Sequence, residues 1–316
     1  MRAEMKICFI GIGSIAQRHI RNLHEILAET RTAVQIDAVR RNASLDGLDV
    51  KPLIHRVYTD TDQLGQYDVI FITNPTEMHL DTLRSVRGKA KAYFIEKPVT
   101  SFRNIADAQD DLWDSDGIYY VACPLRYKKV VQYIKDFAAE NRIIGVRAIS
   151  SSYLPEWRPG QDYRNTYSAQ KALGGGVSID LIHEWDYLRH IFGMPQRVSY
   201  FGGKKSDLEM DAEDTAIYLA EYADKYVELH LDYFGRETIR ECMLFTDKET
   251  VVADLVKNEV RFLKQNRTIV FEESRDDFQK AELRHFLEIV AGTPSDSTIR
   301  EAVQTLYLTQ GVVYHS

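Results

Sequence analysis

The chain has 316 residues, of which 44% are hydrophobic and 28% charged, and its formal net charge is −7 at pH 7. At about 150 residues per domain this length allows two domains, and the composition is that of a globular protein with buried cores. The acidic balance argues against a nucleic-acid partner, which normally requires a basic face.

The first third of the sequence alternates short apolar runs with helical patterns. We predict strands at 6–10, 34–39, 68–73, 92–95 and 118–122, and helices at 15–27, 77–86 and 104–113. Alternation of this kind predicts a parallel sheet that is covered by helices on both faces.

The pattern changes after Pro124. We predict a helix at 128–140, a strand at 145–154, a helix from 174 to 191, alternating β structure over 197–271, and two final helices at 276–291 and 298–314. Successive strands indicate an antiparallel sheet in a second, α+β domain. The sequence therefore predicts an α/β fold with two domains, 1–123 and 124–316.

Targeting and redox signals are sparse. Gly11 and Gly13 interrupt the apolar N-terminal residues before a signal-peptide core forms, and no stretch approaches the roughly 18 apolar residues of a membrane span. Cys8, Cys123 and Cys242 form no CxxC pair, which argues against a metal site and suits a reducing compartment. We therefore expect a cytoplasmic protein without membrane contact.

A glycine-rich turn follows the first predicted strand and opens the first predicted helix. In Gly11-x-Gly13-x-x-Ala16, the first glycine permits a tight turn, the second lets the backbone approach a pyrophosphate, and the alanine allows close packing of helix on strand. The free amides of a helix N-terminus bind phosphates. We therefore predict a dinucleotide with its pyrophosphate over this turn, including Ser14 and Ile15.

The end of the second strand bears on the choice between NAD and NADP. An acidic residue there usually holds the ribose of NAD, whereas a nearby arginine accommodates the 2′-phosphate of NADP. This strand ends in Arg40 and Arg41, and Asp37 lies too early, inside the strand. The sequence favours NADP and leaves NAD open, and both arginines could also be merely solvated.

Four further segments occur in a specific order after the glycine turn. They are Thr73-Asn74-Pro75-Thr76-x-x-His79, Glu96-Lys97-Pro98, Gly174-Gly175-Gly176-x-x-x-Asp180 and Glu282-Leu283-Arg284-His285-Phe286-Leu287. Together with the turn they resemble the glucose–fructose oxidoreductase / inositol dehydrogenase / MocA family over nearly the whole chain.

This resemblance implies a Rossmann domain followed by an open, mainly antiparallel sheet domain that often mediates oligomerisation. It therefore implies a homo-oligomer, a dimer or tetramer. Nicotinamide would lie at the domain junction, and the substrate would be a sugar or sugar-like alcohol that is oxidised or reduced at a hydroxyl or carbonyl.

Lys97 follows the carboxyl end of a predicted strand, where open α/β sheets bind ligands. It could donate to a substrate oxygen and help relay its proton, while Glu96 could pair with it or with a ribose hydroxyl. Asn74 and Pro75 would line the cofactor cleft. His79 would support the cofactor side of the site and would not act as a catalyst. Thr76 departs from the family, which more often has asparagine after the proline.

The spacing between Asp180 and His183 is irregular. Many relatives have this aspartate and the catalytic histidine four residues apart, whereas here they are three apart. Counting from Asp180 puts Glu184 in the histidine's place, and counting back from Asp186 restores His183. We predict His183 as the general acid/base, because a histidine of near-neutral pKa both gives and takes protons, with Asp180 orienting it or binding a substrate hydroxyl.

A polar, aromatic segment precedes the three glycines. Aromatic faces suit sugar rings and arginine forks suit carboxylates or phosphates. The predicted substrate residues are Arg126, Trp157, Arg158, Tyr163, Arg164 and Tyr167. The segment resembles a branch of the family linked to nonulosonic-acid or nucleotide-sugar biosynthesis, which suggests a nucleotide sugar or an acidic sugar. The alternative is a packed loop whose arginines pair with Glu156 and Asp162.

Two other functions remain open. One is a nucleotide-binding regulator or scaffold that keeps the fold without turnover, which the irregular Asp180–His183 spacing would suit. The other is reduction of a C=C or C=N bond, since fold alone does not fix the reaction.

Overall fold

The structure is a computed structural model that describes residues 4–108 and 116–314. The chain forms two compact units. The first runs to Pro124 and includes Arg275–Val303, and the second comprises Leu125–Ser274 and the residues from Gln304 onward. The predicted domain ranges, 1–123 and 124–316, did not assign residues 275–303 to the first unit.

The first unit contains a six-stranded parallel sheet in the order β3-β2-β1-β4-β5-β6. Its strands are β1 (Met5–Ile10), β2 (Val34–Val39), β3 (Arg56–Tyr58), β4 (Tyr67–Ile72), β5 (Ala90–Ile95) and β6 (Ile118–Val121). The predicted parallel sheet is confirmed. β3 was missed because three residues are too few to show a pattern. The strand order reverses beside β1, and open α/β sheets bind ligands at that point.

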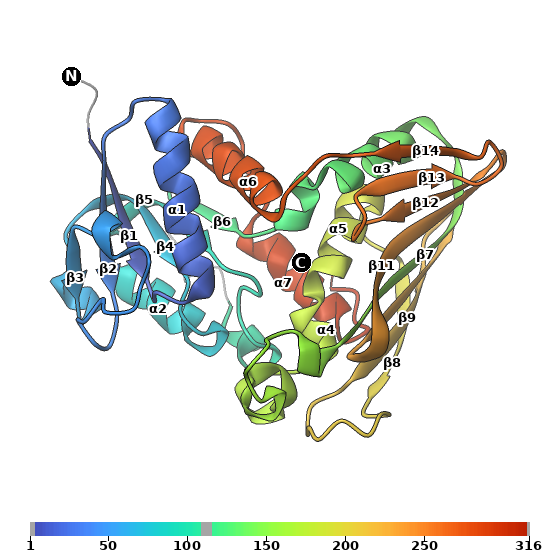
Figure 1. Ribbon diagram of the computed structural model, residues 1–316, viewed down its shortest axis with the longest axis horizontal. Coiled ribbons are helices and arrows are strands. Elements are labelled where there is room, and N and C mark those ends of the chain that lie inside the picture. The colour runs from blue at the N-terminus through green and yellow to red at the C-terminus, as the bar shows by residue number, and fades with distance from the viewer. Residues whose placement is uncertain (1–3, 109–115, 315–316) are drawn as a thin grey trace. The chain divides into compact units, whose positions relative to one another are not determined.

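Helices cover both faces of this sheet. α1 (Ser14–Glu29) and α6 (Arg275–Val290) lie side by side, as Figure 1 shows. Phe286 of α6 packs edge-on against Phe94, with ring centroids 5.2 Å apart, and this aromatic contact explains why the late helix belongs to the first unit. α2 (His79–Val86) lies on the other face, where the Tyr93 hydroxyl donates to the Val86 carbonyl at 2.9 Å.

The predicted helix at 104–113 is corrected in part. Phe102–Asp107 forms a 3₁₀ helix, and residues 109–113 lie outside the described residues.

The second unit contains an eight-stranded open sheet in the order β14-β13-β12-β11-β7-β10-β9-β8. All neighbours are antiparallel except β7 and β10, which are parallel. The strands are β7 (Ile143–Tyr153), β8 (Arg197–Gly203), β9 (Thr215–Glu221), β10 (Tyr226–Asp232), β11 (Phe234–Thr246), β12 (Thr250–Asp254), β13 (Glu259–Phe262) and β14 (Arg267–Val270). The predicted mainly antiparallel sheet is confirmed.

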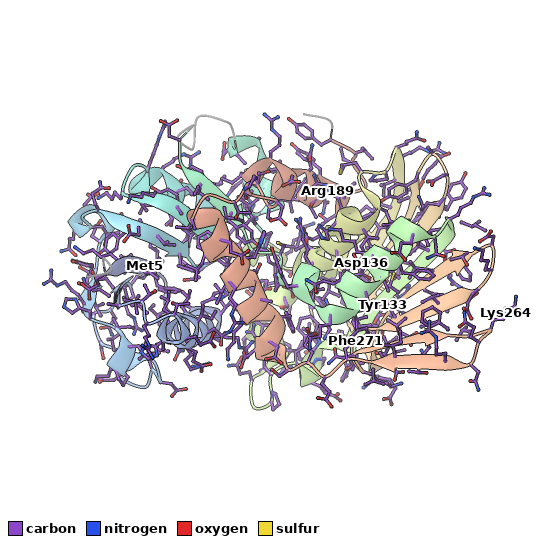
Figure 2. All side chains as sticks on the ribbon, turned by 90° about the horizontal axis from the view of Figure 1, so that it is seen from above. Met5, Tyr133, Asp136, Arg189, Lys264 and Phe271 are labelled. Atoms are coloured by element: carbon purple, nitrogen blue, oxygen red, sulfur yellow. The ribbon has the colours of Figure 1, made fainter. Side chains whose placement is uncertain are left out.

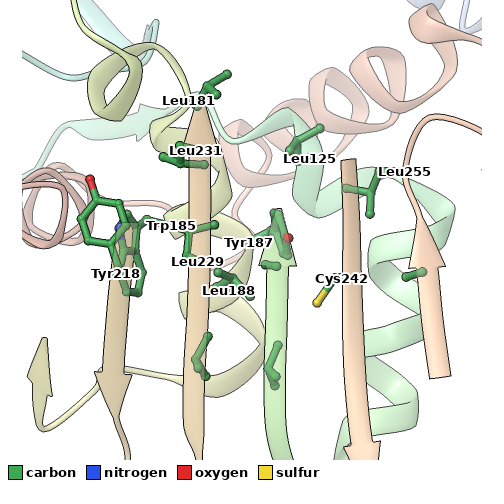
Figure 3. Close-up of a cluster of buried hydrophobic side chains, with 14 of the residues drawn as sticks. Leu125, Leu181, Trp185, Tyr187, Leu188, Tyr218, Leu229, Leu231, Cys242 and Leu255 are labelled. Atoms are coloured by element: carbon green, nitrogen blue, oxygen red, sulfur yellow. The ribbon is translucent and has the colours of Figure 1, made fainter. Parts of the chain in front are cut away.

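Helices cover one face of this second sheet (Figure 1). They include α3 (Lys129–Glu140), α4 (Val177–Asp180) and α5 (Ile182–Phe192). The core between helices and sheet is shown in Figure 3, where Trp185 of α5 meets Tyr218 of β9 edge-on at 5.2 Å. At the other end of the sheet, Tyr133 of α3 and Phe271 lie close together (Figure 2), with ring centroids 5.7 Å apart.

Two helix predictions in the second half need correction. The helix expected over 174–191 is divided at Leu181 (φ −95°, ψ 22°), so α4 and α5 are separate. The final helix, α7 (Ile299–Leu308), ends before the predicted residue 314, since the chain turns at Gly311 (φ 70°). Within the described residues, no helix is long and apolar enough to cross a membrane.

Candidate active site

The turn after β1 packs against the turn after β4. Gly11 has φ 88°, and a Cβ added to it would lie 2.7 Å from Asn74 Cα. The Thr73 hydroxyl donates to the Gly11 carbonyl at 2.7 Å, which ties the two turns together. Only glycine fits this position, as the sequence motif predicted.

Gly13 is the N-cap of α1 and provides no side-chain cap. A Cβ added here would meet no atom of the described residues within 4 Å. The first turn of α1 has no acidic residue, Ser14 is exposed, and Ile15 is partly buried. The helix N-terminus therefore keeps its positive end and unpaired amides for an anion. Ala16 is fully buried, which allows the predicted close packing.

Asp37 lies inside β2 and is not at its tip. It is buried, accepts a hydrogen bond from the Tyr67 hydroxyl at 2.8 Å, and lies 3.2 Å from the His55 ring. After the strand, the Arg40 guanidinium donates to the Ser44 carbonyl, and Arg41 is exposed. The strand end therefore offers arginine without a carboxylate at its tip.

His79 joins the two loops that were predicted to surround the cofactor. Its Nε2 lies 2.9 Å from the Asn74 carbonyl and its Nδ1 3.1 Å from the Pro98 carbonyl. Burial lowers the pKa of His79 despite these two acceptors, so the ring is neutral at pH 7. His79 therefore links the two loops, and its predicted role in support of the cofactor stays a prediction. Pro75 precedes the short turn that leads into α2.

The Asn74 side chain is only half satisfied. Its amide nitrogen donates to the Thr82 hydroxyl at 2.7 Å, whereas Oδ1 is buried without a hydrogen-bond partner among the described residues. A buried unpaired acceptor is costly unless a ligand pairs with it. This acceptor, the open space at Gly13 and the uncapped α1 together fit a bound dinucleotide.

Glu96 pairs with a residue that sequence analysis did not select. His19 Nε2 of α1 lies 2.6 Å from Glu96 Oε1, and both groups are largely buried. Burial alone would raise the pKa of Glu96, but the His19 hydrogen bond and the charges of His19 and Lys97 hold it below its usual value. The pair braces the strand end that carries Lys97, whose amide donates to Glu96 Oε2 at 3.3 Å.

In the second unit, Asp180 lies between two tyrosines. It is 5% exposed and accepts hydrogen bonds from the hydroxyls of Tyr167 and Tyr233, the latter at 2.5 Å. Trp157 packs edge-on against Tyr233 at 5.2 Å and donates from its indole to Ser152. Asp180 thereby organises the aromatic residues that were predicted to bind substrate.

His183 and Glu184 have very different surroundings. Glu184 is fully buried and accepts from the Arg240 guanidinium, at 2.6 Å from Nε. His183 keeps 16% of its side chain exposed, and its Nε2 lies 3.3 Å from Glu184 Oε1. Part of the His183 side chain is therefore exposed, whereas Glu184 is closed to a ligand, which favours the register counted back from Asp186.

The predicted substrate arginines differ in their contacts. Arg126 is 6% exposed and forms a two-pronged ion pair with Asp186, at 2.9 and 2.6 Å. Arg164 pairs with Asp162 and Glu209, which matches the packed-loop alternative. Arg158 is exposed.

An open pocket of about 510 Å³ borders the predicted substrate segment. The Tyr163 hydroxyl, on its wall, accepts from the Glu209 amide at 2.9 Å. The lining residues are Tyr153, Tyr163, Lys205, Ser206, Asp207, Leu208, Glu209, Phe234 and Arg236. Most lie far from the segment in sequence, so no local pattern could have identified them.

The three glycines have a structural role. A Cβ on Gly175 would lie 1.9 Å from the Tyr167 carbonyl oxygen. Gly176 has a φ of 130°, and a Cβ added to it would meet the Glu213 side chain. Close backbone approach at Gly175 and positive φ angles at Gly174 (79°) and Gly176 (130°) therefore account for the three glycines without a ligand.

Comparisons with known proteins agree with this architecture. Residues 5–114 match the oxidoreductase family with an NAD-binding Rossmann fold. Residues 131–250 match the GFO/IDH/MocA C-terminal domain. The fold is thus that of a two-domain NAD-binding oxidoreductase. The chain belongs to the glucose–fructose oxidoreductase / inositol dehydrogenase / MocA family, as the ordered motifs predicted.

Individual relatives are distant. The rhizopine catabolism protein MocA of Rhizobium meliloti is 22% identical over 192 residues, which are 60% of this chain and 58% of MocA. Matches to the curated relatives span 53 to 63% of their lengths.

Two solved structures share the fold over almost the whole chain. UDP-N-acetylglucosamine 3-dehydrogenase from Acidithiobacillus ferrooxidans has a TM-score of 0.78 at 19% identity, covering 98% of this chain and 97% of that one. Levoglucosan dehydrogenase in complex with NADH and levoglucosan has a TM-score of 0.83 at 15% identity, covering 98% and 96%.

Proposed function

We propose that the protein is an NAD(P)-dependent oxidoreductase that acts on a hydroxyl or carbonyl of a sugar or sugar derivative. The observation that carries this proposal is Lys97, which follows β5 in a sheet whose first turn fits a dinucleotide. Family membership and two neighbours named for sugar dehydrogenation support the same reaction.

The dinucleotide, when bound, supplies the hydride acceptor or donor at its nicotinamide. Gly11, Gly13, Ser14 and Ile15 would hold the pyrophosphate through backbone amides and the end of α1. Asn74 would offer its unpaired Oδ1 to the same ligand.

Two residues have catalytic roles, and a third, Asp180, has a positioning role. Lys97 donates to the substrate oxygen, and His183 takes the hydroxyl proton during oxidation and returns it during reduction. Asp180 holds Tyr167 and Tyr233 in place. Trp157, Tyr163 and Tyr167 would contact the sugar ring, with Arg158 as the cation not engaged in a described ion pair. We do not propose Arg126 and Arg164 as substrate residues, because each forms an ion pair with a carboxylate of the protein.

The test is a screen of nucleotide sugars and acidic sugars, following nicotinamide absorbance with NAD(H) and NADP(H). On the substrate found, Lys97→Met should abolish measurable turnover and leave cofactor binding within about twofold, while His183→Ala should cost about 10²-fold. Full turnover in both variants would contradict the proposed proton transfer through Lys97 and His183. Cofactor binding without turnover of any substrate would instead favour a regulator.

We propose NADP as the preferred cofactor, because Arg41 is exposed at the β2 end and Asp37 is already bonded inside the strand. Arg41→Asp should reverse the preference toward NAD, measured as the ratio of the two dissociation constants. A wild-type protein that binds NAD more tightly than NADP would contradict this choice.

We propose a homo-oligomer, a dimer or tetramer, that buries the helix-free face of the second sheet. Phe201 and Ile217 are cross-strand neighbours on β8 and β9, and they are 72% and 45% exposed. Leu219 is exposed on β9 as well, and large exposed apolar patches mark interaction surfaces.

The three free, buried cysteines also support our placement of the protein in the cytoplasm.

A further inference from the structure

A buried carboxylate lies beside the side chain proposed to exchange the substrate proton. Glu184 Oε1 is 3.3 Å from His183 Nε2, and Glu184 has no exposed surface. Glu184 cannot touch a substrate, so any part it takes in the reaction must act through His183.

Arg240 of β11 holds this carboxylate in place. Its Nε and Nη2 both donate to Glu184 Oε1, and charge-assisted bonds of this kind are the strong ones. Burial by itself would raise the pKa of Glu184, but Arg240 and His183 keep it below its usual value. Glu184 is therefore negatively charged at neutral pH.

Among the described residues, Tyr187 of α5 and Cys242 of β11 also face Glu184. Burial raises the pKa of Cys242 to about 12 and that of Tyr187 well above its usual value, so both stay neutral. Lys128 is a charged neighbour of Arg240, and Glu273, at 3.5 Å, offsets the positive charge of Lys128. Within this cluster, the charges beside His183 are therefore those of Glu184 and Arg240.

Asp180 is the carboxylate that the sequence suggested as a partner for His183. Both oxygens of Asp180 accept from tyrosine hydroxyls, Oδ1 from Tyr167 and Oδ2 from Tyr233. The break at Leu181 also separates Asp180 from the helix that carries His183.

We propose that Glu184 and Arg240 are positioning residues that set the basicity of His183. The carboxylate stabilises the imidazolium that forms when His183 takes a proton, and Arg240 keeps the carboxylate ionised and in place. The use made of that proton rests on the proposed function, whereas the coupling between the three side chains does not.

The direct test is a histidine NMR titration of the full-length protein without ligand. The His183 signal is assigned by its loss in His183→Ala. Glu184→Gln should lower the pKa of His183 by about one unit, a tenfold change in its protonation equilibrium. Glu184→Asp keeps the charge and should stay near the wild-type value.

A second variant guards against misfolding. Glu184→Gln combined with Arg240→Met removes both charges while keeping volume, and it should lower the same pKa by a smaller amount, because Glu184 is the nearer charge. A wild-type His183 pKa in either folded variant overturns the proposal.

The activity readout separates this proposal from the function. With an identified substrate, the acid limb of kcat/KM for oxidation should move to lower pH in Glu184→Gln, since His183 must be neutral to act as the base. An active His183→Ala protein beside a clear NMR shift would leave the coupling standing and remove the catalytic role. An inactive His183→Ala protein, together with an unchanged His183 pKa in Glu184→Gln, would keep the catalytic role and remove the coupling.

Discussion

Replacing Arg240 with methionine should destabilise the second unit, because it leaves the Glu184 carboxylate buried without its cation. In the wild-type protein Glu184 is fully buried and its Oε1 accepts two guanidinium donors. Removing one partner of a buried ion pair costs about 3–5 kcal/mol. Arg240 keeps 24% of its side chain exposed, so water reaches part of the site and we expect the lower end, about 3 kcal/mol.

The assay is urea unfolding followed by tryptophan fluorescence, since Trp185 is fully buried in the same core. The double variant Arg240→Met/Glu184→Gln leaves no buried charge and should recover at least about 2 kcal/mol of the loss. Arg164→Met removes an exposed arginine that also pairs with two carboxylates, and it should leave the unfolding midpoint nearly unchanged. A single variant within about 0.5 kcal/mol of wild type, or a double variant no more stable than the single one, would refute this reasoning.

The same pair predicts a dependence on pH. The ordinary pKa of a glutamate is 4.5, and that of Glu184 is lowered in the fold. A lowered folded-state pKa stabilises the protein above the unfolded value, and this stabilisation is lost as pH falls through the folded value. Without Arg240, burial raises the pKa of Glu184, so the folded variant takes up a proton at a higher pH than the wild type does. The stability gap between wild type and Arg240→Met should therefore shrink as pH falls from 7 and continue to shrink through 4.5.

Two further predictions concern the cofactor turn and the open sheet. Gly13→Val should fold normally, since a Cβ there meets no described atom, yet weaken NADPH binding at least about tenfold in a fluorescence titration. Gly11→Ala should instead lower the thermal midpoint, because its Cβ would contact the Asn74 backbone, and equal behaviour of the two variants would contradict this division. Phe201→Asp with Ile217→Lys should reduce the mass measured by light scattering to that of the monomer, whereas Phe201→Tyr should not. An unchanged mass would place the interface elsewhere.

Local patterns in the sequence were enough for the type of both sheets and for the glycine turn after β1, although not for the short strand β3. Strand–helix alternation predicted the parallel sheet, and successive strands predicted the antiparallel one. Gly11 and Gly13 could be interpreted from the sequence because their requirements, a positive φ and an open backbone, are local properties of a turn. The order of motifs along the chain then identified the family before any contact was known.

The partners of the buried charged residues were decided only by tertiary structure. Glu184 meets Arg240 from a strand 56 residues later, and Arg126 meets Asp186 at a separation of 60. Such pairs leave no periodic trace, because each depends on how distant elements pack and not on spacing within one element. For the same reason the sequence could not decide between His183 and Glu184. Both occupy adjacent positions on one helix, and only packing against β11 buries Glu184 completely while His183 keeps 16% of its side chain exposed.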